Sequence, residues 1–158
     1  MYELPQDPAY EGLSIQGRFG RVSYLAWHIL LAITLLILMA TAWLIAPDLF
    51  PPTALVWDSS IVIALFVLFV AQLGTLYFHI IFTIRRLNDC NLTAWWAVLC
   101  LIPFANWLLA FYLVFKPGIS EKNQYGTPRQ TLLWEVGLVY LTGTLIILGS
   151  IIWILFAN

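Results

Sequence analysis

The sequence predicts an all-α protein that crosses a membrane several times. Of its 158 residues, 62% are hydrophobic and only 9% are charged, whereas soluble chains carry about 25% charged residues. Apolar runs at 22–46, 59–84 and 132–156 exceed the roughly 20 residues that a bilayer span needs. In the last run, Trp134 and Trp153 would stand about 28 Å apart on a helix, which fits two interfacial aromatic belts. We therefore expect three full transmembrane helices and one further apolar segment.

The polar residues 1–21 precede the first apolar run and are predicted to form a cytoplasmic N-terminal tail. Residues 22–158 would then form a single membrane-embedded helical domain. The run at 22–46 is too long for the roughly 7–15-residue core of a signal peptide, so we expect a retained anchor. The second run is expected to end at Arg85-Arg86, before a short polar connector at 87–93.

The apolar segment at 94–115 is ambiguous. Its length allows one crossing of about 33 Å as a kinked helix. However, Pro103 and Asn106 bound a Pro-Phe-Ala-Asn sequence with turn chemistry at its middle, which predicts a break. The alternative is a re-entrant hairpin of two half-helices that enters and leaves on one side.

The distribution of basic residues bears on this choice, because cytoplasmic loops collect Lys and Arg. Four simple crossings would place three of the seven basic residues outside. A re-entrant hairpin places all seven inside and the C-terminus outside, so the charge distribution favours the hairpin. The seven are Arg18, Arg21, Arg85, Arg86, Lys116, Lys122 and Arg129.

Polar side chains recur at helical spacing along the second apolar run and form a stripe on one face. Such side chains must face protein or a wet cavity, because hydrocarbon leaves their hydrogen bonds unmade. They either line a pathway or ligand site, with His79 able to titrate near neutral pH, or hydrogen-bond between helices. Together with Glu135, one turn inside the last run, the candidate intramembrane polar residues are Gln72, Thr75, His79, Thr83 and Glu135. Glu135 alternatively reaches the headgroup layer or pairs with Arg129.

A second candidate cluster would lie on the cytoplasmic face if the hairpin topology holds. Asp89 could orient one arginine while others offer bidentate donors to a phosphate or carboxylate. The alternative is that these basic residues fix orientation and contact anionic lipid headgroups. The members are Arg18, Arg21, Arg85, Arg86, Asp89, Asn123 and Tyr125.

Three sequence segments form a recognisable pattern: GRFGRVSYLAWH at 17–28, IRRLNDCNLTAWWAVLCLIPFANW at 84–107 and KPGISEKNQYGTP at 116–128. Together they resemble the bacterial membrane family known as domain of unknown function 805. The chain departs from the family pattern at Asn88, Cys90 and Ser23, where His, Thr and an acidic residue are usual. The last apolar run looks like an addition to the family core. The resemblance implies a bacterial inner-membrane protein and brings no common activity or mechanism.

The residues favour a protein that is not an enzyme and that acts through assembly, as a homo-oligomer or an accessory subunit of a larger envelope or transport complex. The alternative is a small oligomeric transporter or channel for an ion or small molecule. We expect membrane lipids and other membrane proteins as partners. No nucleic acid is expected at a net charge of −1, and His28 and His79, on different runs, give no metal-ligand spacing. No catalytic residue, cofactor or metal is predicted.

Overall fold

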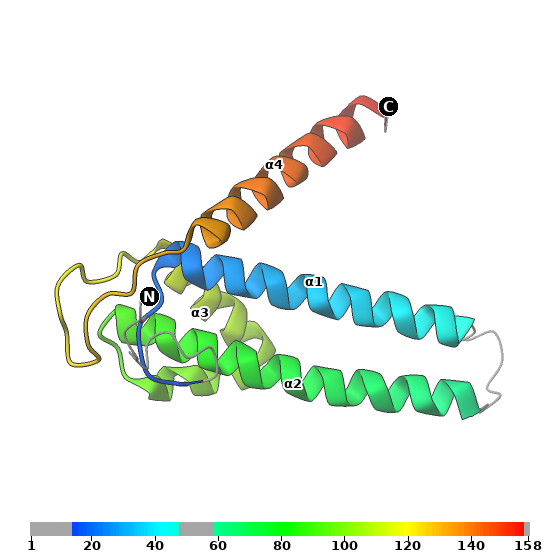
Figure 1. Cartoon of the computed structure of the whole chain (residues 1–158), viewed down its shortest axis with the longest axis horizontal. Helices are drawn as coiled ribbons and strands as arrows, with labels where there is room; N and C mark the ends of the chain where they lie inside the picture. The colour runs from blue at the N-terminus through cyan, green and yellow to red at the C-terminus, as the bar shows by residue number, and fades with distance from the viewer. Residues whose placement is uncertain (1–13, 48–58, 157–158) are drawn as a thin grey trace, which may run out of the picture. The chain divides into compact units, whose positions relative to one another are not determined.

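The computed structural model describes residues 14–47 and 59–156 of the chain. These residues form five helices: α1 (Arg21–Ile45), α2 (Ser59–Asp89), the 3-10 helix η3 (Ala94–Leu101), α3 (Pro103–Phe115) and α4 (Leu133–Phe156) (Figure 1). Helices α1, α2 and α4 are long and apolar enough to cross a membrane, and α3 is a shorter apolar helix. The predicted all-α fold, with three full spans and a broken third apolar segment, is confirmed. Residues 1–13, which belong to the predicted N-terminal tail, and residues 48–58, between the first two runs, lie outside the described residues.

The chain divides into two compact units. One comprises Met1–Ile29 and Ile80–Asn158, and the other is Leu30–His79. The first unit therefore contains residues 14–20, the start of α1, the end of α2, both short helices and α4. Residues 14–20 are not a detached tail, because Arg18 and Phe19 are among the most buried residues of this unit.

The second unit is an antiparallel pair formed by the later part of α1 and the earlier part of α2. Ala42, Ala46 and Ala64 form its small buried core, with Ile61 and Leu68 packed against it. Small side chains let two helix backbones approach closely, which is the usual contact between helices in lipid. Most other side chains of this pair are exposed in the single chain.

Helix α2 extends to Asp89, three residues beyond the expected end at Arg85-Arg86. It closes with a Schellman motif, in which the Leu92 N–H bonds the Leu87 carbonyl at 2.9 Å and the Asn91 N–H bonds the Asn88 carbonyl at 3.1 Å. Asn91 has a φ of 56°, and asparagine is one of the residues that tolerates this left-handed conformation after a helix. The extra helical turn puts Arg85, Arg86 and Asp89 on one rigid element.

The broken apolar segment consists of η3 and α3, which pack against each other. The break is at Ile102, which has an extended conformation with φ −107° and ψ 109°. Pro103 begins α3, where its missing N–H costs nothing. The Asn106 N–H donates to the Ile102 carbonyl at 2.8 Å, so Asn106 belongs to the first turn of α3. The expectation that Asn106 marks the break is therefore wrong.

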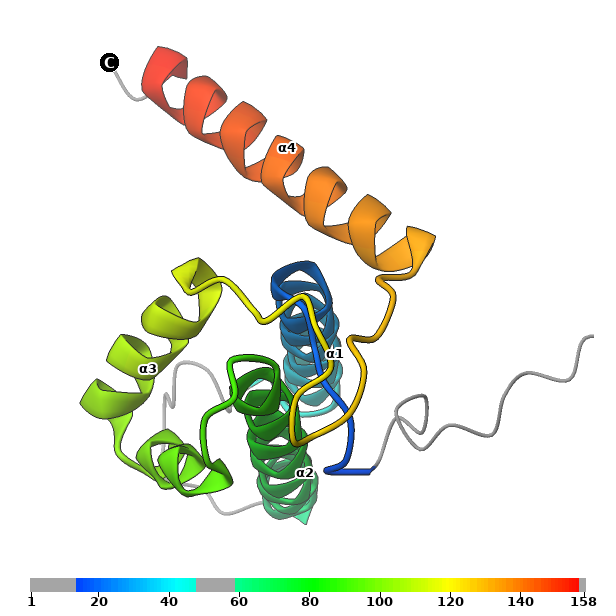
Figure 2. The ribbon, with the colours of Figure 1, turned by 90° about the vertical axis from the view of Figure 1, so that its left-hand side faces the viewer.

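This segment ends where it began. The Ile119 N–H donates to the Asp89 carbonyl at 3.0 Å, and Nε of Arg86 donates to the Leu113 carbonyl at 2.9 Å. The 13 residues of α3 span only about 20 Å, against a hydrocarbon core of about 30 Å. The geometry matches the hairpin alternative, since the segment returns to the end of α2 (Figures 1 and 2).

Candidate functional site

Asp89 is the centre of a buried charged cluster near the end of α2. Its Oδ1 accepts hydrogen bonds from Nε and Nη2 of Arg18 at 3.2 and 3.0 Å, and its Oδ2 accepts one from Nη1 of Arg86. The side chains of both arginines are 0% exposed, and that of Asp89 is 7% exposed. We refer to Arg18, Arg86 and Asp89 as the Arg–Asp cluster.

Arg18 uses all five of its N–H groups. In addition to its bonds with Asp89, Nη1 donates to the carbonyls of Glu121 at 2.8 Å and Gly126 at 3.0 Å, and Nη2 donates to that of Ile119. A guanidinium has five donors in a planar fork, so this arginine is saturated by the connector between α3 and α4. Its role is to hold residues 119–126 against the end of α2.

Arg86 joins the other parts of the same unit. Its Nε bonds the carbonyl of Leu113 in α3, its Nη2 bonds that of Lys116, and its Nη1 contacts that of Phe19 at 3.3 Å as well as Asp89. The carbonyl oxygens supply negative partial charge to a cluster whose formal charge is +1. A buried ion group needs such additional hydrogen bonds to offset its desolvation.

The connector approaches Asp89 too closely for a larger residue than glycine at position 118. A Cβ built on Gly118 would lie 2.7 Å from Cγ of Asp89. Further along, Nδ2 of Asn123 donates to the Asn88 carbonyl at 2.8 Å, and Oδ1 of Asn123 accepts from the Tyr125 N–H at 2.8 Å. Asn123 thus fixes the connector on α2.

Phe19 lies beside the Arg–Asp cluster, and two arginines, Arg85 of α2 and Arg129 of the connector before α4, lie over its ring. The guanidinium carbon of Arg85 is 4.9 Å from the ring centroid and that of Arg129 is 5.3 Å from it. Nε of Arg85 also donates to the Ser14 carbonyl at 2.7 Å. Arginine stacking on an aromatic face is favourable and more so when the pair is removed from water.

A second buried charged group holds the start of α4. Glu135 is 0% exposed and accepts hydrogen bonds from Oγ of Ser23 at 2.8 Å, Nε1 of Trp27 at 2.9 Å, Nη1 of Arg129 at 2.9 Å and the Leu132 N–H at 2.9 Å. We refer to Glu135, Arg129, Ser23 and Trp27 as the Glu135 cluster. It ties α4 to the first turns of α1.

The structure brings together most of the predicted cytoplasmic cluster. Arg18, Arg86 and Asp89 are in direct contact, Arg85 and Asn123 bind adjacent backbone, and Tyr125 packs in the same connector. Arg21, in contrast, is exposed at the first residue of α1, and none of the hydrogen bonds among the described residues joins it to Asp89.

The predicted intramembrane residues do not form one site. Thr83 is buried in the first unit against Tyr24 and Cys100, and Glu135 belongs to its own cluster. In the second unit, Oγ1 of Thr75 donates to the Ala71 carbonyl of its own helix at 2.9 Å, His79 is half-buried and Gln72 is exposed. The alternative pairing of Glu135 with Arg129 is the one that the structure shows.

Sequence reasoning did not find Ser23 and Trp27 as partners of Glu135, or the six backbone carbonyls that bind Arg18 and Arg86. Ser23 and Trp27 lie four positions apart, on one face of a helix, which was the available signal. Carbonyl acceptors have no residue-type signature, so the sequence offered none.

Cys90 is buried immediately after α2. Burial raises the pKa of its thiol, against a smaller lowering effect of the nearby Arg86 guanidinium. The thiol therefore stays protonated at neutral pH and is a poor nucleophile. Among residues 14–47 and 59–156, no group of three or more His, Cys, Asp or Glu side chains could hold a metal ion.

The model of a protein family described as "Protein of unknown function (DUF805)" matches residues 12–127. The chain belongs to the DUF805 family. The matched range contains the Arg–Asp cluster and the hairpin and ends before α4, so Glu135 ties a helix outside the family match to residues inside it.

A stretch of 42 residues is 43% identical to "Inner membrane protein YhaH" of Escherichia coli (strain K12), and the same values hold for the protein of that name in Escherichia coli O157:H7. The match covers 27% of this chain and 35% of each relative, so the chain spans about a third of the length of these curated relatives. No solved structure matches the chain. The chain is thus a membrane protein of the DUF805 family, similar to an inner membrane protein.

Proposed function

We propose that this protein acts through assembly, as a homo-oligomer in the bacterial inner membrane, without a catalytic step of its own. One observation carries the proposal, which is the exposure of Gln72 on α2. The Arg–Asp cluster supports the non-enzymatic part, since the hydrogen bonds of its two arginines go to the protein's own backbone and to Asp89.

Gln72 lies near the middle of the 31-residue helix α2, a level that the hydrocarbon core occupies. None of the hydrogen bonds among the described residues involves its amide. An amide left unpaired in hydrocarbon costs several kcal/mol. Another polar group must therefore cover Gln72 in the membrane.

A second copy of the chain fits this requirement best. A glutamine amide has both a donor and an acceptor, so two copies related by a two-fold axis can exchange equivalent hydrogen bonds. Leu65, Phe69 and Gln72 follow one another at steps of four and three residues, so they share one face of α2. Leu65 and Phe69 are also exposed and would pack at the same contact. An apolar rim around a polar pair is typical of helix association in lipid.

Replacing Gln72 by leucine is expected to weaken the oligomer about 3-fold to 20-fold, since hydrogen bonds between membrane helices contribute about 0.6 to 1.7 kcal/mol. The measurement is the mass distribution by native mass spectrometry of protein released from lipid nanodiscs, over a range of protein-to-lipid ratios. The matched control is Val70→Leu, on another face of α2. A wild-type chain that remains strictly monomeric and copurifies with no other protein would refute the proposal.

The transporter alternative rests on the same residue, because water in a path at the centre of an oligomer would also satisfy the Gln72 amide. It differs in one outcome. Ion or solute flux into proteoliposomes that is present in the wild type and lost in Gln72→Leu and His79→Ala would favour transport over a purely structural assembly.

We further infer that the Arg–Asp cluster lies on the cytoplasmic side of the membrane. The hydrogen bonds of Arg18, Arg86 and Arg129 bring together residues 14–20, the end of α2, the end of α3 and the start of α4, so the basic residues share one side. Cytoplasmic segments collect such residues.

Labelling of single cysteines tests this orientation. A cysteine at Lys122 should react in intact cells only with a membrane-permeant maleimide, and one at Asn158 should also react with an impermeant maleimide. Cys90 and Cys100 are buried and provide a low background, which the unmodified chain measures. Equal reaction of both positions with the impermeant reagent would contradict the orientation and the hairpin together.

A further inference from the structure

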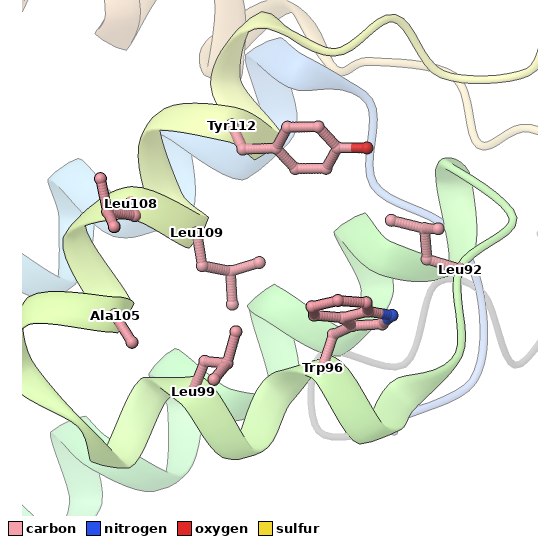
Figure 3. Close-up of a pocket in the computed structure, with 7 residues that line it drawn as sticks. All are labelled: Leu92, Trp96, Leu99, Ala105, Leu108, Leu109 and Tyr112. Atoms are coloured by element: carbon pink, nitrogen blue, oxygen red, sulfur yellow. The ribbon is translucent and has the colours of Figure 1, made fainter.

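The hairpin of η3 and α3 forms a half-open apolar cavity of about 350 Å³. The lining residues on α3 run from Ala105 to Tyr112, which is about 10 Å along that helix. Figure 3 shows the side chains of the two helices facing each other across the space, with Tyr112 and Trp96 on opposite walls. We refer to it as the hairpin cavity, lined by Leu92, Trp96, Leu99, Ala105, Leu108, Leu109 and Tyr112.

The surroundings of the hairpin cavity indicate where its occupant comes from. The outer faces of the two helices carry large exposed apolar side chains, with Trp95 83%, Phe104 80% and Trp107 78% exposed. Exposed apolar surface of this extent on a hairpin between membrane spans is covered by lipid. An occupant of the cavity can therefore enter directly from the bilayer.

The cavity has a polar end and an apolar end. Nζ of Lys116 donates to the Tyr112 hydroxyl at 2.6 Å and lies 5.0 Å from the centroid of its ring. This places a cation next to the wall nearest the connector, whereas Leu99 and Ala105 lie toward the break at Ile102. An occupant with an anionic group at one end and a hydrocarbon chain at the other matches this arrangement.

We propose that the hairpin cavity binds one acyl chain of an anionic membrane phospholipid, whose phosphate is held by Lys116 and the Tyr112 hydroxyl. The chain lies between η3 and α3, where each methylene removed from water or from a poorly packed space adds to the binding. The phosphate lies at the level of the connector, where headgroups are found and where lysine serves as a phosphate-binding point charge. The lipid fills the hairpin and so supports its two short helices.

Native mass spectrometry of the full chain in detergent, titrated with phosphatidylglycerol or phosphatidylcholine, tests the proposal. One phosphatidylglycerol is expected to remain bound per chain. Ala105→Phe narrows the cavity and should abolish retention of both lipids. Trp107→Leu, on the outer face of the same helix, is the control and should leave retention unchanged. Equal retention by Ala105→Phe and the wild type would overturn the proposal.

The headgroup contact is tested separately, so that a folding defect in Ala105→Phe leaves the proposal open to refutation. Lys116→Gln should lower the preference for phosphatidylglycerol over phosphatidylcholine about fivefold, whereas Lys122→Gln should not change it. An unchanged preference in Lys116→Gln would refute the assigned phosphate contact. Excess inorganic phosphate should leave the lipid bound because the acyl chain holds it, and displacement by phosphate alone would show that the cavity is not occupied by a chain.

Discussion

Replacing Asp89 by asparagine is expected to lower the free energy of unfolding by about 3–5 kcal/mol, the cost of removing one partner from a buried charged group. Asparagine preserves the shape of the side chain but leaves Arg18 and Arg86, both fully buried, without a counter-charge. Its amide group also directs N–H donors at guanidinium donors. The measurement is unfolding of the purified chain in detergent micelles, followed by circular dichroism.

The matched control is Glu121→Gln in the connector that Arg18 binds. The side chain of Glu121 is exposed, and only its backbone carbonyl accepts from Arg18, so the change should be within about 0.5 kcal/mol. A loss below about 1 kcal/mol in Asp89→Asn would show that the Arg–Asp cluster is solvated in the folded protein, which would contradict its burial.

Replacing Glu135 by glutamine is expected to cost about 3 kcal/mol or more for the same reason. The Glu135 carboxylate accepts from four groups, among them the Arg129 guanidinium, whose side chain is 5% exposed. A glutamine can offer only one acceptor oxygen, so at least one donor would face an NH₂ group. The start of α4 should then separate from α1, which limited proteolysis between residues 127 and 132 would detect.

A double variant distinguishes loss of the charge pair from a general defect. If Arg129→Gln is added to Glu135→Gln, no unpaired charge remains, and the combined loss should be smaller than the sum of the two single losses. The proteolysis pattern of the double variant should also return toward that of the wild type. Additive losses, in contrast, would mean that Arg129 and Glu135 do not interact energetically.

The fold was predictable because hydrophobic runs of membrane length have few alternative structures. What the sequence could not supply was the end of α2. Arginines were expected to terminate the helix at the membrane surface, but a helix ends where its last carbonyls find partners. In this chain that place is Asn91. The buried arginines bind Asp89 and backbone carbonyls, and a hydropathy pattern reveals none of these contacts.

The candidate site was predictable at the level of residue types and less so at the level of contacts. The sequence grouped Arg18, Arg86 and Asp89, and the structure places these three in contact. Glu135 was grouped with the α2 stripe because all of these residues are polar and lie within apolar runs. A helical period relates residues within one helix and does not identify the neighbouring helix. Ser23, where the resemblance implied an acidic residue, donates its hydroxyl to the Glu135 carboxylate at 2.8 Å.

The hydrogen bonds of Arg18 join it to residues 71 to 108 positions later in the chain. During synthesis, this guanidinium emerges long before the carbonyls of residues 119–126, and closing so long a loop is entropically costly until those residues exist. The N-terminal segment therefore cannot complete its docking while α1 and α2 are being inserted. Translation of the stretch after the hairpin sets the moment at which the earliest part of the polypeptide acquires its final structure.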